Sequence, residues 1–308
     1  MASAAKAPLE LTPMQLFTLS HIKTKPIPPP ATLNLSGQTA IVTGSNTGIG
    51  FHAARVLLEH KLSHLIMAVR SIDKGEAAAQ ALRKDFPKAQ IDVWQLDMLS
   101  YDSIQSFVKR CHERLDRLDM ALLNAGVSGG PFAKSPSTGH EVTFQVNYIS
   151  TALLAILLLP VLKSKSPKGK PGTLTLISSA LGLQCAFPNR DADPLIPSFD
   201  NSEGWNMQKT MAQYSLSKMC VLMLLQKLAE HVDARDVIIN AAEPGFTPGS
   251  GLGRQAPWLF KALMWLFTPL LSLMSRSERQ AAWAEVHAVA VVGKESHGGF
   301  VMNWDIFP

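Results

Sequence analysis

Three side chains that can act together on one oxygen atom lie in the second half of the chain. Tyr214 and Lys218 are four residues apart in a helical pattern from 207 to 232, so they share a face of that helix. A phenol has a pKa of about 10 and works as an acid–base group at neutral pH only where a cation stabilises its anion, which Lys218 is placed to do. Ser179 ends an apolar run and offers that oxygen a second hydrogen bond. The pattern predicts proton transfer at a substrate oxygen; the alternatives are Ser178 in place of Ser179, and an ordinary helical pair.

A glycine-rich turn lies between the apolar run 39–42 and a helix-like run over 53–58. Its glycines permit positive φ, allow a ligand to approach the backbone, and leave helix N–H groups free to bind an anion. We interpret the turn, spaced G-x-x-x-G-x-G, as a cradle for a pyrophosphate group; a tight strand-to-helix loop without a ligand is the alternative. The residues expected to contact that group are Gly44, Asn46, Thr47, Gly48, Ile49 and Gly50.

Polar residues also follow the next strands of the pattern. Arg70 ends the apolar run 64–69, about 20 residues beyond the glycines, where an acidic residue would hold a ribose 2′-OH and an arginine accommodates a 2′-phosphate. A solvated charge is the alternative for Arg70. Asp73 is expected to cap the helix that follows, over 74–86, and the Asp97 carboxylate can accept a hydrogen bond from an adenine amino group. The other residues expected at this sheet edge are Met98, Asn124, Ala125, Gly126, Pro244, Gly245 and Thr247.

Apolar runs of strand length alternate with helical patterns along the chain. The expected strands are 39–42, 64–69, 90–96, 118–123, 173–177, 237–241 and 299–303, and the expected helices are 53–58, 74–86, 100–115, 140–162, 207–232 and 278–291. This alternation predicts the α/β class, with one parallel sheet covered by helices on both faces. We expect an N-terminal extension over 1–36 and a single doubly wound domain over 37–308, in which segments 186–206 and 250–277 cover the substrate.

Composition narrows the classes of partner. The 308 residues are 46% hydrophobic and 17% charged with a net charge of +5, and no basic run supports nucleic-acid binding. Three widely spaced cysteines indicate free thiols in a reducing compartment and no metal site, so we expect a cytoplasmic protein. The apolar stretch 258–274 contains Lys261 and Pro269 and is too short to span a membrane, although contact with a membrane surface stays an alternative.

Five motifs in this order resemble the short-chain dehydrogenase/reductase family: the glycine turn, Asn124-Ala-Gly126, Ser179, Tyr214-x-x-x-Lys218 and Pro244-Gly245. The resemblance covers residues 37 to 305 and is strongest to the retinol-dehydrogenase-like branch and to reductases of fungal secondary metabolism. It implies a seven-stranded Rossmann-fold sheet ordered 3-2-1-4-5-6-7 and a nicotinamide beside Ser179 and Tyr214. It also implies that Asn147 holds a water linking Lys218 to solvent.

The resemblance has two departures. Ser179 and Tyr214 are 214 − 179 = 35 residues apart, more than compact members need, which is why segment 186–206 is expected beside the substrate. Where the family often has a threonine that holds the nicotinamide amide, this chain has Gly249, so Thr247 or Ser250 is left to supply the hydroxyl.

The function that this resemblance implies is NADPH-dependent reduction of a ketone or aldehyde on a small apolar substrate of polyketide- or terpenoid-like character, with Tyr214 as the proton donor. The alternatives are an NADP-dependent alcohol dehydrogenase, an enzyme steering epimerisation, dehydration or cyclisation, and a scaffold without chemistry, although no catalytic residue is missing. A monomer or a homodimer is expected, because the apolar helices around 149–162 and 221–228 suit either a dimer bundle or the core.

Overall fold

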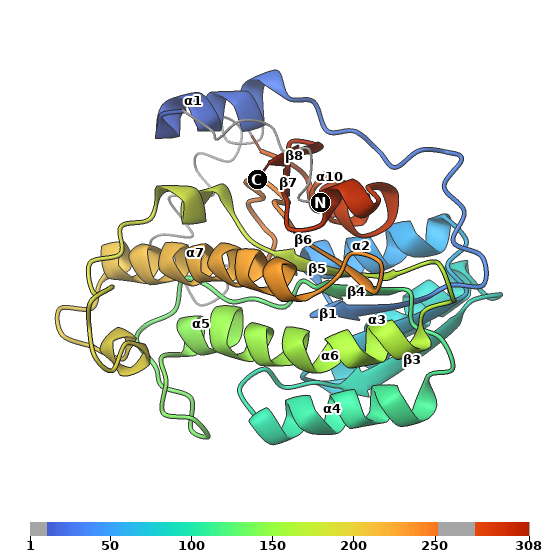
Figure 1. The fold of residues 1–308 in the computed structure, drawn as a ribbon, viewed down its shortest axis with the longest axis horizontal. Coiled ribbons are helices and arrows are strands. Elements are labelled where there is room, and N and C mark those ends of the chain that lie inside the picture. The colour runs from blue at the N-terminus through green and yellow to red at the C-terminus, as the bar shows by residue number, and fades with distance from the viewer. Residues whose placement is uncertain (1–10, 252–274, 308) are drawn as a thin grey trace.

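One eight-stranded sheet forms the centre of the computed structural model, which describes residues 11–251 and 275–307. The strand order is β3-β2-β1-β4-β5-β6-β7-β8 (Figure 1). Strands β1 to β7 run parallel, and β8 pairs antiparallel with β7. The strands are β1 Thr39–Thr43, β2 His64–Val69, β3 Gln90–Gln95, β4 Met120–Leu123, β5 Gly172–Ile177, β6 Val237–Ala242, β7 Phe300–Met302 and β8 Asp305–Phe307. The predicted α/β class and strand order are confirmed, and the predicted number of seven strands is corrected to eight.

Helices cover both faces of the sheet, as the alternating pattern predicts. The α-helices of the described chain are α1 Pro13–Thr18, α2 Gly48–Glu59, α3 Ile72–Asp85, α4 Tyr101–Arg114, α5 Val142–Phe144, α6 Thr151–Lys165, α7 Met207–His231 and α10 Glu278–Val286. Shorter π- and 3₁₀-helical turns lie at Leu19–Lys23, Gln145–Ser150, Ala180–Gln184, Ile196–Phe199, His287–Val291 and Lys294–Ser296. One core cluster joins α4, α6 and α7 to one face, and a second joins α2, α3 and α10 to the other. The carboxyl ends of the parallel strands β1 to β7 therefore lie at one edge of a sheet that is buried on both faces.

The start of α3 differs from the expected capping. The helix begins at Ile72, and the hydroxyl of Ser71 accepts a hydrogen bond from the Lys74 N–H. Asp73 lies inside the first turn, where its charge favours the positive end of the helix dipole. Sequence alone does not separate Ser71 from Asp73, because serine and aspartate both cap helices well. The extended backbone of Ser71 identifies it as the cap.

Helix α6, with the turns before it, is long and apolar enough by composition to span a membrane, over Val142–Lys165. Its leucines instead pack into the core below the sheet, where Leu154, Leu158 and Leu162 have no exposed surface. Ile156 on the outer side of α6 and Met223 on α7 are each 49% exposed. The helix therefore works as a core helix, with part of its outer face open.

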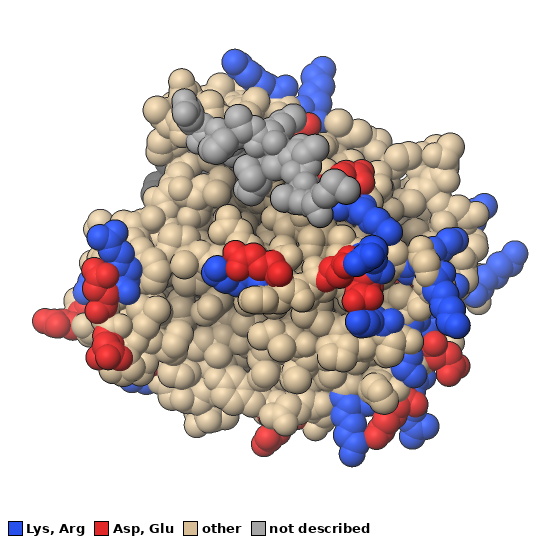
Figure 2. Space-filling model, viewed as in Figure 1, with Lys and Arg blue, Asp and Glu red and all other residues tan. Residues whose placement is uncertain are grey.

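Surface charges of opposite sign lie beside one another. In Figure 2, lysine and arginine side chains alternate with acidic ones on the face shown. Lys163 bonds Asp236 at 2.7 Å and Lys227 bonds Glu230 at 2.9 Å, both at the surface. This arrangement matches the mixed charge pattern read from the sequence.

Candidate active site

Tyr214 and Lys218 lie one helical turn apart on α7 and reach the carboxyl end of β5. The Lys218 Nζ donates a hydrogen bond to the Ile177 carbonyl at 2.8 Å and lies 5.7 Å from the centre of the Tyr214 ring. Lys218 is 4% exposed, whereas Tyr214 keeps part of its surface open. The two side chains are thus held together where a strand ends, as the spacing predicts.

The two serines after β5 have different environments. The Ser178 hydroxyl is buried and donates to the Lys218 carbonyl at 2.9 Å, so it ties the strand to α7. The Ser179 hydroxyl accepts from the Leu181 N–H at 3.3 Å, and it lies near enough to Tyr214 to lower the pKa of that phenol. The structure therefore favours Ser179, and not Ser178, as the partner of the tyrosine.

Burial controls the protonation of this pair. It raises the pKa of Tyr214 to about 12, helped by the neighbouring Glu243 carboxylate and opposed by the Ser179 hydroxyl. Burial also lowers the pKa of Lys218 to about 8, while Glu285 acts in the opposite direction. The expected lowering of the tyrosine pKa by the Lys218 ammonium is not found, so the phenol keeps its proton at neutral pH.

Asn147 lies in the π-helical turn Gln145–Ser150, directly below the end of β4. Its side-chain oxygen accepts from the Val127 N–H at 2.9 Å, and its amide donates to the Val127 carbonyl at 2.9 Å and to Ser217 at 3.1 Å. A Cβ on Gly126 would lie 3.3 Å from the Asn147 Oδ1 and 3.7 Å from the Lys218 Nζ. Asn147 and Lys218 therefore flank the same glycine, with the asparagine fixing the loop after β4.

The glycine turn packs tightly against the loop that follows β4. Gly48 has φ +64° and begins α2, so the free N–H groups of the first helical turn face the loop side. A Cβ on Gly50 would lie 2.3 Å from the Asn124 Nδ2, which donates to the Thr43 carbonyl at 2.8 Å. The Ala125 N–H donates to the Thr43 hydroxyl at 2.9 Å. Backbone approach this close, beside a helix N-terminus, fits a bound pyrophosphate.

The residues expected around the adenosine divide into two kinds. Arg70 is exposed at the end of β2, and the Asp97 carboxylate accepts from the Leu99 N–H at 3.0 Å, which leaves its other oxygen for a ligand. Met98 is buried in the core, so its side chain does not face this edge. Lys74 is not among the residues predicted to bind the cofactor, yet it lines a hollow of about 490 Å³ together with Asn46 and Thr47.

The turn after β6 carries Pro244 and Gly245. Thr247 is 9% exposed and its hydroxyl donates to the Gly245 carbonyl at 3.1 Å, within the turn itself. Ser250 lies at the glycine turn, since its carbonyl oxygen would be 2.7 Å from a Cβ on Gly48. Of the two hydroxyls left open for the cofactor, Ser250 is therefore the one beside the cradle, whereas Thr247 bonds within its own turn.

Two buried carboxylates and a buried arginine join this site without having been predicted. Glu243 accepts from the Ala180 N–H at 3.2 Å, and burial raises its pKa while Arg276 lowers it. Glu285 is fully buried, and neither of its oxygens has a hydrogen-bond partner among the described residues. An acidic residue within the apolar run Ala281–Val292 is a signal that could have identified Glu285 from sequence.

A cavity of about 1200 Å³ opens above these residues. Its lining includes the catalytic candidates Ser179, Tyr214 and Lys218 and reaches the glycine turn at Ile49. Glu243 and Glu285 also line it. Within the described chain, no three histidine, cysteine or acidic side chains are grouped as a metal would require. The site can thus transfer protons at an oxygen placed beside Tyr214.

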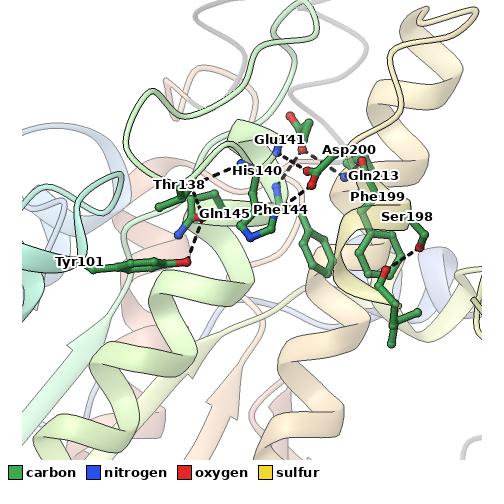
Figure 3. A network of polar contacts seen from close by, with 11 residues as sticks. Tyr101, Thr138, His140, Glu141, Phe144, Gln145, Ser198, Phe199, Asp200 and Gln213 are labelled. Atoms are coloured by element: carbon green, nitrogen blue, oxygen red, sulfur yellow. Dashed lines mark hydrogen bonds and ion pairs between the residues drawn. The ribbon is translucent and has the colours of Figure 1, made fainter. Parts of the chain in front are cut away.

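Segment 186–206 is not a wall of this cavity, contrary to expectation: none of its residues lies in the lining. Figure 3 shows why, because Asp200 accepts from the Glu141 N–H at 2.6 Å and contacts the His140 Nδ1 at 2.8 Å. Gln213 of α7 donates to both Glu141 and Phe199 at 3.2 Å. These bonds and the stacking of Phe199 on Phe144, at 4.2 Å between ring centres, hold the segment against the start of α5.

The second expected lid, 250–277, is described only at its two ends. Ser250 and Gly251 line the cavity, and residues 252–274 lie outside the described part of the chain. The apolar stretch 258–274 therefore stays a prediction.

Known proteins resemble this chain over its whole length. Residues 38–189 match the family described as short chain dehydrogenase. Short chain dehydrogenase/reductase mfmJ of Annulohypoxylon moriforme is 50% identical over 310 residues, covering 100% of this chain and 88% of the relative. Short chain dehydrogenase virL of Hypocrea virens is 44% identical, covering 92% of this chain and 82% of the relative.

Solved structures show the same fold at lower identity. The oxidoreductase yciK from E. coli has a TM-score of 0.65 at 21% identity, covering 89% of this chain and 97% of that one. A short chain oxidoreductase from Pseudomonas aeruginosa, solved with NADPH bound, has a TM-score of 0.65 at 20% identity and covers 87% of this chain and 95% of that one. From its sequence relatives and its fold, the chain belongs to the short-chain dehydrogenase/reductase family, whose members are NAD(P)-dependent oxidoreductases.

Proposed function

We propose that this protein reduces a ketone or aldehyde on an apolar substrate, with NADPH as the hydride donor. The observation that carries the proposal is the meeting of Ser179, Tyr214 and Lys218 at one end of a large cavity whose other lining reaches the glycine turn at Ile49. The nucleotide would lie along this edge of the sheet and supply a hydride to carbon. Side chains of the protein would bind and protonate the carbonyl oxygen of the substrate.

Tyr214 is suited to donate a proton in this reaction. Its pKa of about 12 keeps the phenol protonated, so it enters the reductive direction as a loaded acid. Ser179 lies in the same lining as Tyr214 and can donate a second hydrogen bond to the substrate oxygen. Lys218 is mostly protonated below pH 8, and its charge stabilises the phenolate left after transfer. Oxidation would need that phenolate at the outset, which the raised pKa disfavours.

The preference for NADPH rests on two cations beside the expected ribose. Arg70 at the end of β2 is exposed, and Lys74 lines the hollow beside Asn46 and Thr47. No acidic side chain takes the place of Arg70 at this strand end. A 2′-phosphate would gain charge-assisted hydrogen bonds from these cations, whereas a free 2′-OH would gain little.

An apolar substrate of secondary metabolism is supported by the cavity and by the relatives. The exposed surface of the lining is mostly apolar, with polar side chains both at Ser179 and Tyr214 and elsewhere, such as His21. Relatives at 44% and 42% identity come from the fungi Hypocrea virens and Penicillium oxalicum.

The test is the consumption of NADPH, followed by absorbance at 340 nm, across aldehydes and ketones of increasing size. Reduction by wild-type protein, lost in Tyr214→Phe with NADPH binding retained, supports the proposal. Faster oxidation of the matching alcohols with NADP⁺ would assign the protein to the dehydrogenase direction instead. An absence of redox turnover on every compound, with the nucleotide bound, would point to the non-redox alternatives.

A further inference from the structure

The N-terminal segment, outside the sheet, covers the catalytic cavity. Residues Pro13–Thr18 form α1 and Leu19–Lys23 form the π-helical turn that follows it. The hydroxyl of Thr12 and the side chain of Gln15 form a reciprocal capping box that starts the helix. Eight residues between 13 and 22 line the same cavity as Ser179 and Tyr214. The segment contributes no strand to the sheet, so sheet formation does not explain why it lies at the cavity.

Buried polar contacts fix the segment to two distant parts of the chain. The Arg276 guanidinium donates to the Ser20 carbonyl at 3.1 Å, to the Pro244 carbonyl at 3.1 Å and to the Asn303 Oδ1 at 2.9 Å. The Asn303 amide donates in turn to the Ser20 hydroxyl at 2.9 Å. Figure 1 shows α1 beside the C-terminal hairpin of β7 and β8. The segment is therefore tied to the turn after β6, which carries Pro244 at the catalytic end.

The inner side of the segment is aromatic and carries an imidazole. The rings of Phe17 and His21 lie 4.7 Å apart, and His21 meets Phe246 edge-on at 6.3 Å. All three side chains line the cavity. The His21 Nδ1 is buried and has no hydrogen-bond partner among the described residues. Burial and the charge of Arg276 lower the pKa of His21 to about 4, so the ring is neutral and can accept or donate one hydrogen bond.

We propose that residues 13–22 form the far wall of the substrate site, where Phe17 and His21 select a large apolar carbonyl compound that carries a hydrogen-bonding group remote from its carbonyl. The inference rests on the proposed reductase function for the carbonyl and on the cavity for the rest. Phe17 supplies the flat surface on which rings of the substrate pack. His21 supplies the polar contact, because it lines the cavity and its buried Nδ1 has no hydrogen-bond partner among the described residues.

Phe17→Ala tests the wall, with Leu19→Ala as the matched control. Leu19 is a half-buried apolar residue of the same segment and does not line the cavity. The first readout is equilibrium binding of Nile red, a polycyclic apolar carbonyl dye, followed by its fluorescence. We expect Phe17→Ala to weaken dye binding roughly ten-fold, which corresponds to about 1.4 kcal/mol, and Leu19→Ala to change it less than two-fold. Equal effects of the two substitutions, or no effect of Phe17→Ala, would overturn the assignment of the wall.

Size selectivity gives the second readout. With NADPH, Phe17→Ala should lower kcat/KM for a three-ring ketone about ten-fold and leave cyclohexanone unchanged, because a small ketone does not reach the far wall. A fall for both ketones would show a general loss of the site and count against the proposal. If the wild type reduces neither ketone, the reductase function fails, while the dye measurement still decides whether the wall exists.

His21→Leu tests the polar contact separately. In the wild type, at least one hydroxy-1-tetralone from the set with 5-, 6- and 7-hydroxyl groups should be turned over with higher kcat/KM than 1-tetralone. A single neutral hydrogen bond makes the expected ratio roughly five-fold. The substitution should bring that ratio close to one without lowering the rate on 1-tetralone. A wild type that shows no preference within the set, or a preference that survives in His21→Leu, would remove His21 from the proposal.

Discussion

Replacing Glu285 with glutamine should stabilise the protein more at pH 8 than at pH 5.5. The side chain is fully buried near the end of α10, and its oxygens lack hydrogen-bond partners within the described residues. Burial raises its pKa from 4.5 to about 8, and the Lys218 ammonium only partly opposes this. Between pH 4.5 and about pH 8, Glu285 keeps its proton in the folded protein and loses it in the unfolded chain. The free energy of unfolding of the wild type therefore falls as the pH rises through this interval.

The size of the effect follows from that interval. Each pH unit between the two pKa values costs about 1.4 kcal/mol of unfolding free energy, so the range from pH 5.5 to 8 gives an upper limit of about 3 kcal/mol. Because the Lys218 ammonium stabilises ionised Glu285, we expect the unfolding free energy of the wild type to fall by less than this limit, roughly 2 kcal/mol. Lys218 itself has its pKa lowered to about 8, so in the wild type its own cost is relieved only above pH 8. Glu285 raises that pKa, so in Glu285→Gln the relief begins at a lower pH and widens the gap between the two proteins. Glu285→Gln stays neutral throughout and should lose this fall with pH.

Urea unfolding followed by tryptophan fluorescence at pH 5.5, 6.5 and 8 measures the difference. The gap between Glu285→Gln and wild type should widen steadily with pH. Glu230→Gln is the control, because Glu230 is exposed on α7 and paired with Lys227 at 2.9 Å. A gap of constant size from pH 5.5 to 8 would refute the reasoning, since it would show that Glu285 is already ionised in the folded protein at pH 5.5.

Three further changes test the catalytic and nucleotide sites. Tyr214→Phe should lower kcat at least about 100-fold while the NADPH dissociation constant, from nucleotide fluorescence, stays within about two-fold; wild-type turnover would remove Tyr214 as the acid. Arg70→Ala should reduce the preference for NADPH over NADH about ten-fold and Lys74→Ala less, by the same titration; a wild type that binds both nucleotides equally would contradict this. Gly50→Ala places a Cβ 2.3 Å from the Asn124 amide and should cost about 1–3 kcal/mol by urea unfolding as well as weaken NADPH binding; an unchanged midpoint would show that the turn has more room.

The sheet was readable from sequence because each parallel strand is a short apolar run followed by a helical pattern. The last strand, β8, was missed for a local reason. It follows β7 through Asn303 and Trp304, which both take positive φ, of 55° and 62°. Such a two-residue turn is usually marked by Asn-Gly, and a tryptophan at its second position gives no such signal. The buried packing of the hairpin fixes a turn that local preference alone would not predict.

The proposed catalytic pair could be predicted because helical spacing places Tyr214 and Lys218 on one face. The segments that line the cavity could not be predicted from the sequence. Segment 186–206 reads correctly as a loop, but the side on which it folds depends on Asp200 meeting His140, 60 residues away. Similarly, the N-terminal extension carries none of the family motifs, and the place of its residues 13–22 at the cavity depends on contacts with Arg276. Long-range polar contacts of this kind leave no periodic trace in the sequence.

Arg276 explains why these separate segments meet at one site. A Cβ on Gly245 would lie 2.6 Å from the Arg276 Nη1, so only a glycine lets the guanidinium reach the Pro244 carbonyl. The same guanidinium, 3% exposed, holds Ser20 and Asn303 and lies 4.8 Å from the centre of the Trp304 ring. A buried cation is costly unless its donors find partners. Here Nη1 and Nη2 bond the N-terminal segment, the turn after β6 and the C-terminal hairpin, whereas Nε has no partner among the described residues. Gly245 of the Pro-Gly turn thus has two roles: it lies where we propose the nicotinamide binds, and it lets Arg276 anchor the N-terminal segment that we propose as a wall of the substrate site.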